Sequence, residues 1–274
     1  MSQTDAMKIP TPFWRSVEAL NNFVYLVPEA ATHYKAIGLK GSWMGYFASR
    51  SAPLGAASPE LVIATFHGFA PHLVHRAIPD AWSFATPEAV LASRLELATG
   101  VLGKAVTAEQ AAPLADALEK VVGGLDLAGK PLAAAHASLS LPPDDLERFW
   151  LLDAVVREYR GDCHIALLLA EGLNGVDANV LNVAAGRTFP NQQSLRGWSD
   201  EEWAAGKERL RERGWLDGAG QLTESGTAFR NELEDRTDQV CEAWMTDEAI
   251  AAAVDVTEDI RAAARALRTL FSPA

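Results

Sequence analysis

One short segment in the second half of the chain concentrates side chains that can take part in chemistry. The sequence YRGDCHIALLLAEGLNG, at 159–175, holds Arg160, Asp162 and His164 within five residues, together with a cysteine. Arg160 can bind an anion, and His164 can exchange a proton near neutral pH. The structural alternative is that Gly161 ends one helix and Asp162 caps the amides of the next. We predict a structural cap at Asp162, with Arg160 and His164 as candidate contacts to a ligand.

Three of the six histidines lie within nine residues, in the sequence FHGFAPHLVHRAIPDAW at 66–82. The proline inside this segment suits the first turn of a short helix, which places His72 and His75 on one face, with His67 just ahead. Neutral imidazoles bind zinc and other transition metals, but only Asp80 offers a carboxylate nearby. The sequence therefore predicts no cofactor and no metal. The three histidines are weak metal candidates and candidate contacts to a ligand.

Aromatic side chains recur at helical spacing in the sequence WMGYFASR at 43–50. A face of this kind lines a pocket for an organic ligand or belongs to the core. No glycine-rich phosphate loop follows a predicted strand, and no nucleophile elbow occurs in the sequence, so no catalytic residue is assigned. The candidate ligand-binding residues are Trp43, Tyr46, Arg50, His67, His72, His75, Trp82, Arg160 and His164.

The elements that position these residues are predicted to be almost entirely helical. Ala and Leu are abundant, and alternating runs of β-branched residues are nearly absent. Ser58, Thr86 and Ser199 each stand before a segment with the pattern of a helix start. We expect helices at 13–36, 43–51, 58–66, 71–77, 86–104, 107–123, 128–138, 143–160, 163–172, 176–185, 199–213, 223–243 and 247–271.

The second half of the chain has the element order of a winged helix. The helix at 176–185 is followed by a polar loop and by WSDEEWAAGKERLRERGWLDGAGQLTESG at 198–226. This last segment indicates a helix and then two short strands joined by a glycine turn. The first half holds a weaker copy, in which 58–66 and 82–98 correspond to the two helices at a similar spacing. A duplication of one module is the interpretation that this spacing favours.

The fold class that follows is mainly α, with two degenerate winged-helix-like units in tandem, the second carrying a short two-stranded wing. We expect an N-terminal helical unit at 1–138 and a C-terminal, MarR-like unit with long C-terminal helices at 139–274. The last helix, at 247–271, has an apolar face that either packs internally or forms a dimer. That face contains Ile260, Ala264, Leu267 and Phe271.

Several motifs together carry a resemblance to a known family. The segments GYFASRSAPLGAASPELVIATF, LVHRAIPDAW, YRGDCHIALLLAEGLNG and RGWLD…LTESG resemble the actinobacterial SalK-like helix-turn-helix family over nearly the whole chain. The phrase LRERGWLD…GQLTESG is similar to the end of the recognition helix and the wing of MarR-type regulators. The resemblance implies the architecture, because members of this family often lack an assigned biochemical activity. At 66–69 this chain has FHGF where the family pattern tends to have Phe-Tyr-Asn-Phe.

The charge of the chain bears on DNA as a partner. Twenty-four basic residues against thirty-six acidic ones give a net charge of −12 and a pI near 5.0, whereas DNA-binding domains usually present a basic face. The expected recognition helix begins with Ser-Asp-Glu-Glu at 199–202, and the wing turn DGAGQ has no Lys or Arg. The basic residues farther along this helix alternate with Glu208 and Glu212, as on a solvated, ion-paired face. DNA remains a possible partner but is disfavoured by this acidic helix.

Two further features place the chain among proteins of the cytoplasm. No apolar run approaches the eighteen residues of a membrane span, and the N-terminal sequence lacks the basic start and apolar run of a secretory signal. The two cysteines, Cys163 and Cys241, are too few for a disulfide framework and form no paired metal motif. We expect a cytoplasmic monomer or homodimer with no membrane partner.

These observations predict a regulator-like protein that binds a small molecule, an aromatic or apolar metabolite, in a pocket between its helices. MarR-like proteins supply a fold-level analogy for such a pocket. Three alternatives stay open at this point. The first is an enzyme of specialised metabolism on an adapted winged-helix scaffold, and the second is a ligand-responsive DNA-binding transcription regulator. The third is a protein-binding adaptor, for which the acidic charge and the Ala-rich helix at 247–271 speak.

Overall fold

Fifteen α-helices and two short 3-10 helices build the part of the chain that the computed structural model describes, residues 8–25 and 27–271. The first half contains α1 (Thr11–Asn22), a 3-10 turn (Phe23–Tyr25), α2 (Pro28–Ala36), α3 (Gly41–Ser51), a second 3-10 turn (Ala52–Leu54), α4 (Pro59–Phe66), α5 (Pro71–His75), α6 (Ala81–Phe84), α7 (Pro87–Leu102), α8 (Ala108–Gly123) and α9 (Pro131–Ala137). The second half contains α10 (Asp145–Ala170), α11 (Gly175–Ala184), α12 (Gln192–Arg196), α13 (Asp200–Glu212), α14 (Glu224–Glu242) and α15 (Asp247–Leu270).

Three predicted helix starts are confirmed by their caps. The hydroxyl oxygens of Ser58, Thr86 and Ser199 each accept a hydrogen bond from the backbone amide three residues farther on. At Ser199 the side chain of Glu202 also accepts from the amide of the cap residue, which completes a capping box. An N-cap of this kind is worth about 1 kcal/mol, so these residue types locate helix ends in the sequence.

Two of the predicted helix boundaries are wrong. The helix expected at 13–36 is two helices, because Pro28 lacks an amide proton and stands at the first position of α2. Conversely, the helices expected at 143–160 and 163–172 form the single helix α10, which continues through Gly161. The short helices α6 and α12 carry no signal that the sequence prediction used.

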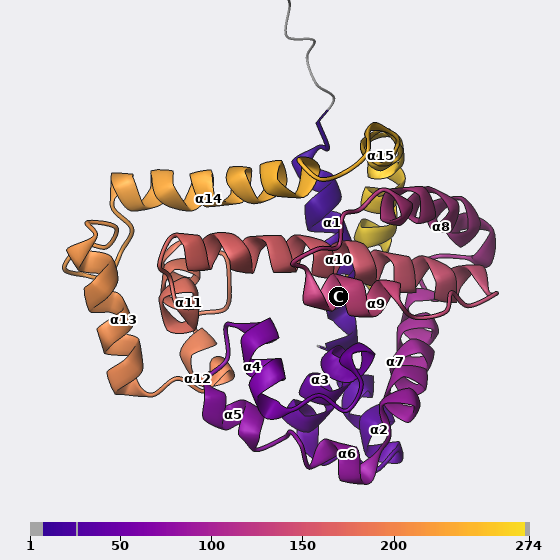
Figure 1. Cartoon of the computed structure of the whole chain (residues 1–274), viewed down its shortest axis with the longest axis horizontal. Coiled ribbons are helices and arrows are strands. Elements are labelled where there is room, and N and C mark those ends of the chain that lie inside the picture. The colour runs from indigo at the N-terminus through magenta and orange to yellow at the C-terminus, as the bar shows by residue number, and fades with distance from the viewer. Residues whose placement is uncertain (1–7, 26, 272–274) are drawn as a thin grey trace, which may run out of the picture.

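Helix α10 runs through the middle of the molecule, and α1, α8, α9 and α14 pack against it (Figure 1). Fourteen of its 26 residues are buried, among them the charged residues Asp153, Glu158 and Asp162. A helix covered on several sides does not need a single apolar stripe. This burial also explains why α10 tolerates Gly161, since a glycine inside a helix costs only about 1 kcal/mol relative to alanine.

Two hydrophobic cores lie along α10. The larger core contains α1, α3, α7, α8 and α15, and the smaller one contains α11, α13, the end of α10 and part of α14. Helix α15 packs against α1 and α8 with Ile260, Ala264 and Leu267 buried, so this part of its apolar face packs internally, whereas Phe271, just after the helix, is exposed. The unit boundary at residue 138 stays a prediction, and the larger core draws on residues from both sides of it.

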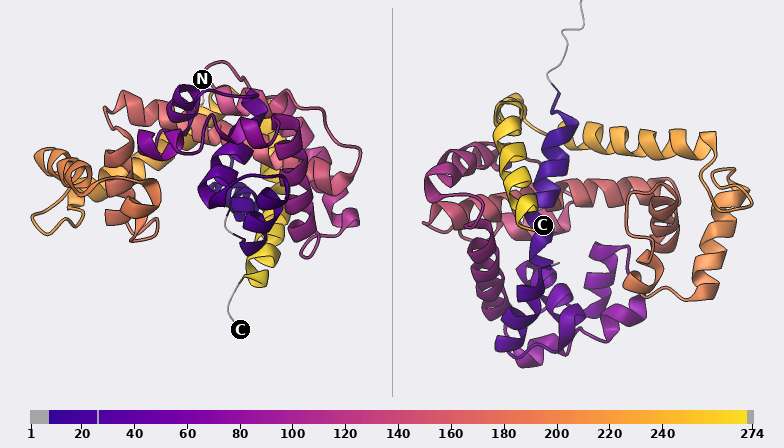
Figure 2. Two further views of the ribbon diagram at one scale, coloured as in Figure 1. Left: turned by 90° about the horizontal axis from the view of Figure 1, so that it is seen from below. Right: turned by 180° about the vertical axis from the view of Figure 1, so that it is seen from behind.

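The helix-turn-helix segment lies at one end of the molecule, where α13 projects beyond the other helices (Figure 2). Helix α13 packs closely on α11, with Trp203 and Leu210 buried. The two-stranded wing is not formed in the described residues: Leu216 and Leu222 pair in one isolated antiparallel bridge. The ring of Trp215 stacks on Phe229 at 3.7 Å between centroids and so fixes this turn on α14 instead. The tandem arrangement of two winged-helix units stays a prediction.

No helix among the described residues has an apolar stretch long enough to cross a membrane.

Candidate functional site

A cavity of about 240 Å³ opens where the two halves of the molecule meet, and we call it the central cavity. Its walls come from α1, α3, α4, α10, α11 and α12 and from the turn after α4. Aromatic and apolar side chains form part of the wall, including Trp14, Tyr46 and Phe66. The polar part of the wall contains Arg50, His67, Arg157, Arg160, His164, Asn179, Asn182 and Arg196, with Glu18 as the single carboxylate among the lining residues.

The structure brings five of the nine predicted ligand-binding residues together in this cavity. They come from two helices and one turn that are far apart in the sequence. Tyr46 and Arg50 lie on α3, Arg160 and His164 lie on α10, and His67 follows α4. The two motifs that looked independent in the sequence, WMGYFASR and YRGDCH, therefore face the same space.

The other four predicted residues lie elsewhere. Trp43 packs in the core beside Phe47, with 5.8 Å between ring centroids. The indole nitrogen of Trp82 donates a hydrogen bond to the backbone oxygen of Ala57 at 2.9 Å, which is a structural contact. His72 and His75 are exposed on α5.

The three histidines of the 66–82 segment do not converge. His67 lines the central cavity, whereas His72 and His75 point to the surface of α5. Within residues 8–25 and 27–271, no three His, Cys, Asp or Glu side chains gather closely enough to hold a metal ion. The spacing that made these residues weak metal candidates thus does not translate into a shared site.

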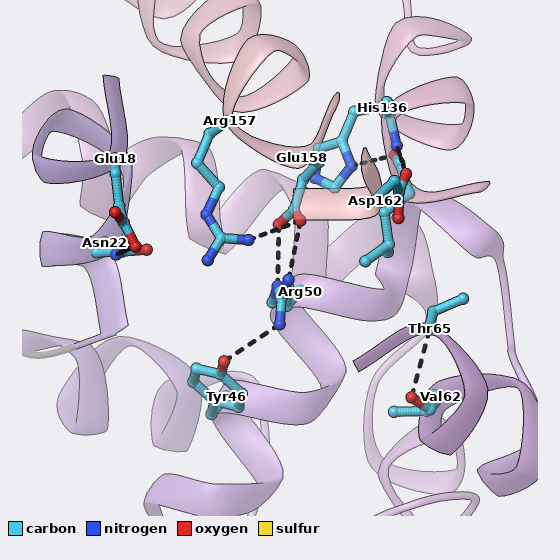
Figure 3. A network of polar contacts seen from close by, with 12 residues as sticks. Glu18, Asn22, Tyr46, Arg50, Val62, Thr65, His136, Arg157, Glu158 and Asp162 are labelled. Atoms are coloured by element: carbon cyan, nitrogen blue, oxygen red, sulfur yellow. Dashed lines mark hydrogen bonds and ion pairs between the residues drawn. The ribbon is translucent and has the colours of Figure 1, made fainter. Parts of the chain in front are cut away.

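A buried ion-pair network forms the floor of the central cavity (Figure 3). Arg50 donates from Nε and Nη2 to the two carboxylate oxygens of Glu158, both at 2.9 Å. Arg157 donates from Nη1 to the same carboxylate at 2.7 Å, and Arg50 Nη1 reaches the hydroxyl of Tyr46 at 3.4 Å. Burial alone raises the pKa of Glu158, but the attraction of Arg157 and Arg50 outweighs it and holds that pKa well below its ordinary value.

Two arginines thus share one carboxylate in this network. Arg50 and Glu158 are almost completely inaccessible, at 7% and 1% side-chain exposure, so their bidentate geometry is protected from water. Arg157 uses Nη1 for its bond to Glu158, and its side chain also lines the central cavity. The two arginines and the one carboxylate together therefore carry a net charge of +1.

Arg196 adds a further positive charge to the same cavity. It ends helix α12, and its guanidinium carbon lies 4.1 Å from the centroid of the Phe69 ring. Across the described residues, no carboxylate lies within ion-pair distance of Arg196. Burial lowers the pKa of Arg196 from its ordinary value, as expected for a cation without an acidic partner. The backbone oxygen of Arg196 accepts from Ala70 at 2.9 Å, which fixes α12 against the turn after α4.

A second set of ion pairs holds Arg160 at the cavity. Arg160 on α10 contacts Glu234 at 2.7 Å and Asp238 at 2.8 Å, both on α14. Arg230 pairs with the same Glu234 and donates from Nε to the side-chain oxygen of Asn182. Because the oxygen of Asn182 is engaged in this way, its amide nitrogen is the group left to donate into the cavity.

The hydrogen bonds around His164 fix its tautomer. Thr237 donates its hydroxyl proton to the backbone oxygen of Leu233 at 2.7 Å, so its oxygen accepts from His164 Nδ1 at 2.9 Å. Burial lowers the pKa of His164 to about 4, and the ring is neutral at physiological pH. Nε2 of His164 then carries a lone pair rather than a proton and can accept a hydrogen bond in the cavity.

His67 occupies a strained backbone position at the edge of the cavity. Its φ is +52° with ψ at −55°, a conformation that residues with a side chain rarely adopt. The ring atom Nε2 is buried without a hydrogen-bond partner, and burial lowers the pKa of His67. On the other side, the backbone oxygen of His67 lies so close to Gly175 that a Cβ there would collide with it. The site therefore holds an unsatisfied polar atom in a tightly constrained turn.

Asp162 has a different structural task from the one the sequence suggested. It lies inside α10 instead of at a helix start, and its Oδ2 accepts from the backbone amide of Ala133 at 3.0 Å. Ala133 is in the first turn of α9, so Asp162 caps a neighbouring helix across the α9–α10 contact. Burial raises the pKa of Asp162 to about 7, although the hydrogen bond from Ala133 opposes this shift.

The sequence prediction missed several residues that line the central cavity. Arg157 stands three positions before Arg160 and seven before His164, so the three share one face of a continuous helix. That signal was present but was hidden by the false helix break at Gly161. Arg196 lies in the connection between α11 and α13, for which the sequence offered no periodic pattern.

The surface that would meet DNA is acidic in the structure as well. Asp200 and Glu201 are exposed in the first turn of α13. Arg209 is bound to Asp177 at 2.7 Å, and Arg213 donates to backbone oxygens after α10. The turn between α12 and α13, residues 197–199, has the three residues of a helix-turn-helix motif, so the acidic start of α13 and not the length of the turn weighs against DNA.

Comparison with known protein families shows which family the fold belongs to. The model of a helix-turn-helix family matches the chain over residues 11–270. This range begins with α1 and ends with α15, so the match covers the whole fold and not the α11–α13 segment alone. No curated protein and no solved structure matches the chain significantly.

Proposed function

Because the chain belongs to this helix-turn-helix family, we propose that it is a regulator-like member that binds a small organic anion in the central cavity. The observation that carries this proposal is the charge of the cavity wall. Four arginines line the cavity; Arg50 and Arg157 share the carboxylate of Glu158, and Arg160 is paired with Glu234 and Asp238. Arg196 has no carboxylate within ion-pair distance among the described residues, so the wall keeps an excess of positive charge. In a chain with a net charge of −12, such a local excess of positive charge is costly unless a ligand compensates it.

The shape and chemistry of the wall define the kind of anion. Trp14, Tyr46 and Phe66 supply an aromatic, apolar surface, which suits an aromatic or otherwise unsaturated body. Arg157 and Arg196 supply planar donors, which match a carboxylate by paired hydrogen bonds. An organic carboxylate with such a body satisfies both halves of the wall, and a purely apolar metabolite would leave Arg196 without an acidic partner.

The polar groups beside these arginines favour a ligand that also carries a donor. His164 offers Nε2 as an acceptor in its neutral form, and Asn182 offers its amide nitrogen as a donor. A hydroxyl or amino substituent on the ligand would satisfy His164. A pKa of about 4 makes His164 a weak base at neutral pH, which argues against the enzyme alternative.

A thermal-shift screen tests the proposal directly. Each carboxylate of an aromatic and aliphatic panel is compared with its own uncharged amide, because only the charge then differs within a pair. A ligand that binds only the folded protein raises the melting temperature with its concentration. We expect at least one acid to raise it while its amide does not. A panel in which acids and amides act alike, or in which neither acts, would reject an anion site.

DNA binding is the second candidate, since the family is a helix-turn-helix family and α13 packs on α11 in the manner of such a motif. The exposed Asp200 and Glu201 weigh against it. A gel-shift assay with the promoter fragment of the protein's own gene, at low salt and then at rising salt, separates the two candidates. A specific complex that weakens steeply with salt supports DNA binding, and no complex at low salt excludes it.

A further inference from the structure

A second cavity, of about 210 Å³, lies between α7, α10 and the segment that follows α9. It shares no lining residue with the central cavity. Leucines from all three segments, Leu91, Leu139 and Leu151 among them, form most of its wall. Three polar side chains interrupt this apolar wall: Arg94 from α7, Trp150 from α10 and the exposed Ser140.

Arg94 is a buried cation whose hydrogen bonds are incomplete. It is 1% exposed, and its Nη1 donates to the backbone oxygen of Ser49 at 2.8 Å. The same Nη1 faces His136 Nε2 at 3.2 Å, but Nε of Arg94 has no partner. Along the described chain, no carboxylate lies within ion-pair distance of Arg94.

The neighbours of Arg94 do not compensate its charge. His136 Nδ1 lies 2.8 Å from the backbone oxygen of Leu132, which can only accept, so Nδ1 carries the proton and Nε2 accepts from Arg94. Burial lowers the pKa of His136 to about 3, and the ring therefore stays neutral. The buried carboxylate of Glu158 is already bound by Arg50 and Arg157.

Trp150 also has a hydrogen-bond donor without a partner. It is 1% exposed, and its indole Nε1 is a buried donor without an acceptor. The guanidinium carbon of Arg94 lies 5.1 Å from the centroid of the Trp150 ring, so the two unsatisfied donors belong to one group. Buried donors are normally paired, so Arg94 and Trp150 make this part of the wall positively charged and rich in donors.

We propose that this second cavity binds a small monocarboxylate with an apolar body, its carboxylate directed toward Arg94 and Trp150. One cation matches one negative charge, whereas a phosphate dianion would keep an unpaired charge in an apolar cavity. The leucine wall fits a compact hydrocarbon body. An uncharged apolar ligand would fill the space but would leave both donors unsatisfied.

Benzoate, with benzamide as its uncharged counterpart, is a suitable probe. The indole N–H signal of Trp150 in a ¹H–¹⁵N correlation spectrum reports on this cavity alone, and it is identified by its loss in Trp150→Phe. We expect benzoate to shift the Trp150 signal in a saturable way and benzamide to bind at least tenfold more weakly. A Trp150 signal that does not move with benzoate, or that moves equally with benzamide, would overturn the proposal.

A matched pair of variants locates the response. Ala92 is an exposed residue at the rim of the cavity, and Ala92→Trp should block it, whereas Ala89→Trp, one turn earlier on α7, lies outside the lining. We expect A92W to weaken benzoate binding at least tenfold and A89W to leave it unchanged, with both variants keeping the wild-type circular dichroism spectrum. Arg196→Met, in the central cavity, should not change the Trp150 response. Equal binding by A92W and A89W would place benzoate elsewhere and refute the assignment.

Discussion

The buried pair of Arg50 and Glu158 allows a sharp prediction about stability. Glu158 is 1% exposed and accepts two hydrogen bonds from Arg50 and one from Arg157. Glu158→Met removes the carboxylate and leaves Arg50 buried without a counter-charge, for which we expect a loss of about 3–5 kcal/mol in the free energy of unfolding. Arg50→Met leaves Glu158 with Arg157 as its one remaining partner and should cost somewhat less.

The double variant decides whether this reasoning holds. When both residues are replaced by methionine, neither member of the buried pair is left without its partner, and replacements of this kind are often neutral. We therefore expect the double variant to lie within about 1 kcal/mol of the wild type in urea unfolding followed by circular dichroism at pH 7. A double variant as unstable as the sum of the two single variants would refute the reasoning. Glu258→Met, at the exposed ion pair with Arg261, is the control and should change the stability by less than about 1 kcal/mol.

Three further predictions test the surroundings of the site. Burial raises the pKa of Asp162 to about 7, so the folded protein holds this proton more tightly than the unfolded chain and loses stability as the pH rises from about 4 to about 7. Asp162→Asn should remove up to about 4 kcal/mol of this pH-dependent loss in the free energy of unfolding. If urea unfolding shows the same pH dependence of that free energy in the variant and the wild type, the prediction is contradicted. Gly175→Ala sets a Cβ against the backbone oxygen of His67 and should cost about 1–3 kcal/mol in urea unfolding, whereas Gly100→Ala on α7, with open space beside it, should gain up to about 1 kcal/mol. In an NMR titration, His164 should stay neutral, protonated at Nδ1, down to about pH 5, and a midpoint near 6.5 would show that its ring is not buried.

The helices were predictable from the sequence wherever local chemistry sets their ends. Ser58, Thr86 and Ser199 cap the helices that their patterns indicated. The error at Gly161 arose because a glycine next to an aspartate is typical of a helix boundary. In the structure that local preference is outweighed by the burial of α10 on both sides of Gly161, which no local pattern reveals.

The central cavity was predictable in part, for a similar reason. Tyr46, Arg50 and His164 stand out because their types and spacing suit a ligand, and the fold brings them together. Arg196 did not stand out, because its position depends on how α12 docks against the turn after α4, a contact between distant segments. The positive charge of the cavity could not be read from a chain with a net charge of −12, since the balance of ion pairs is set by tertiary structure.

The central claim is that Arg196 and its neighbours in the central cavity bind an organic carboxylate. Isothermal titration of the tightest acid from the panel into wild type, Arg196→Met and Arg261→Met measures this most directly. Loss of a charge-assisted hydrogen bond is worth about 1.5–3 kcal/mol, so R196M should raise the dissociation constant roughly tenfold to 150-fold. R261M removes the same charge from the exposed surface of α15 and should leave the constant unchanged. Equal affinities for all three proteins would contradict the account.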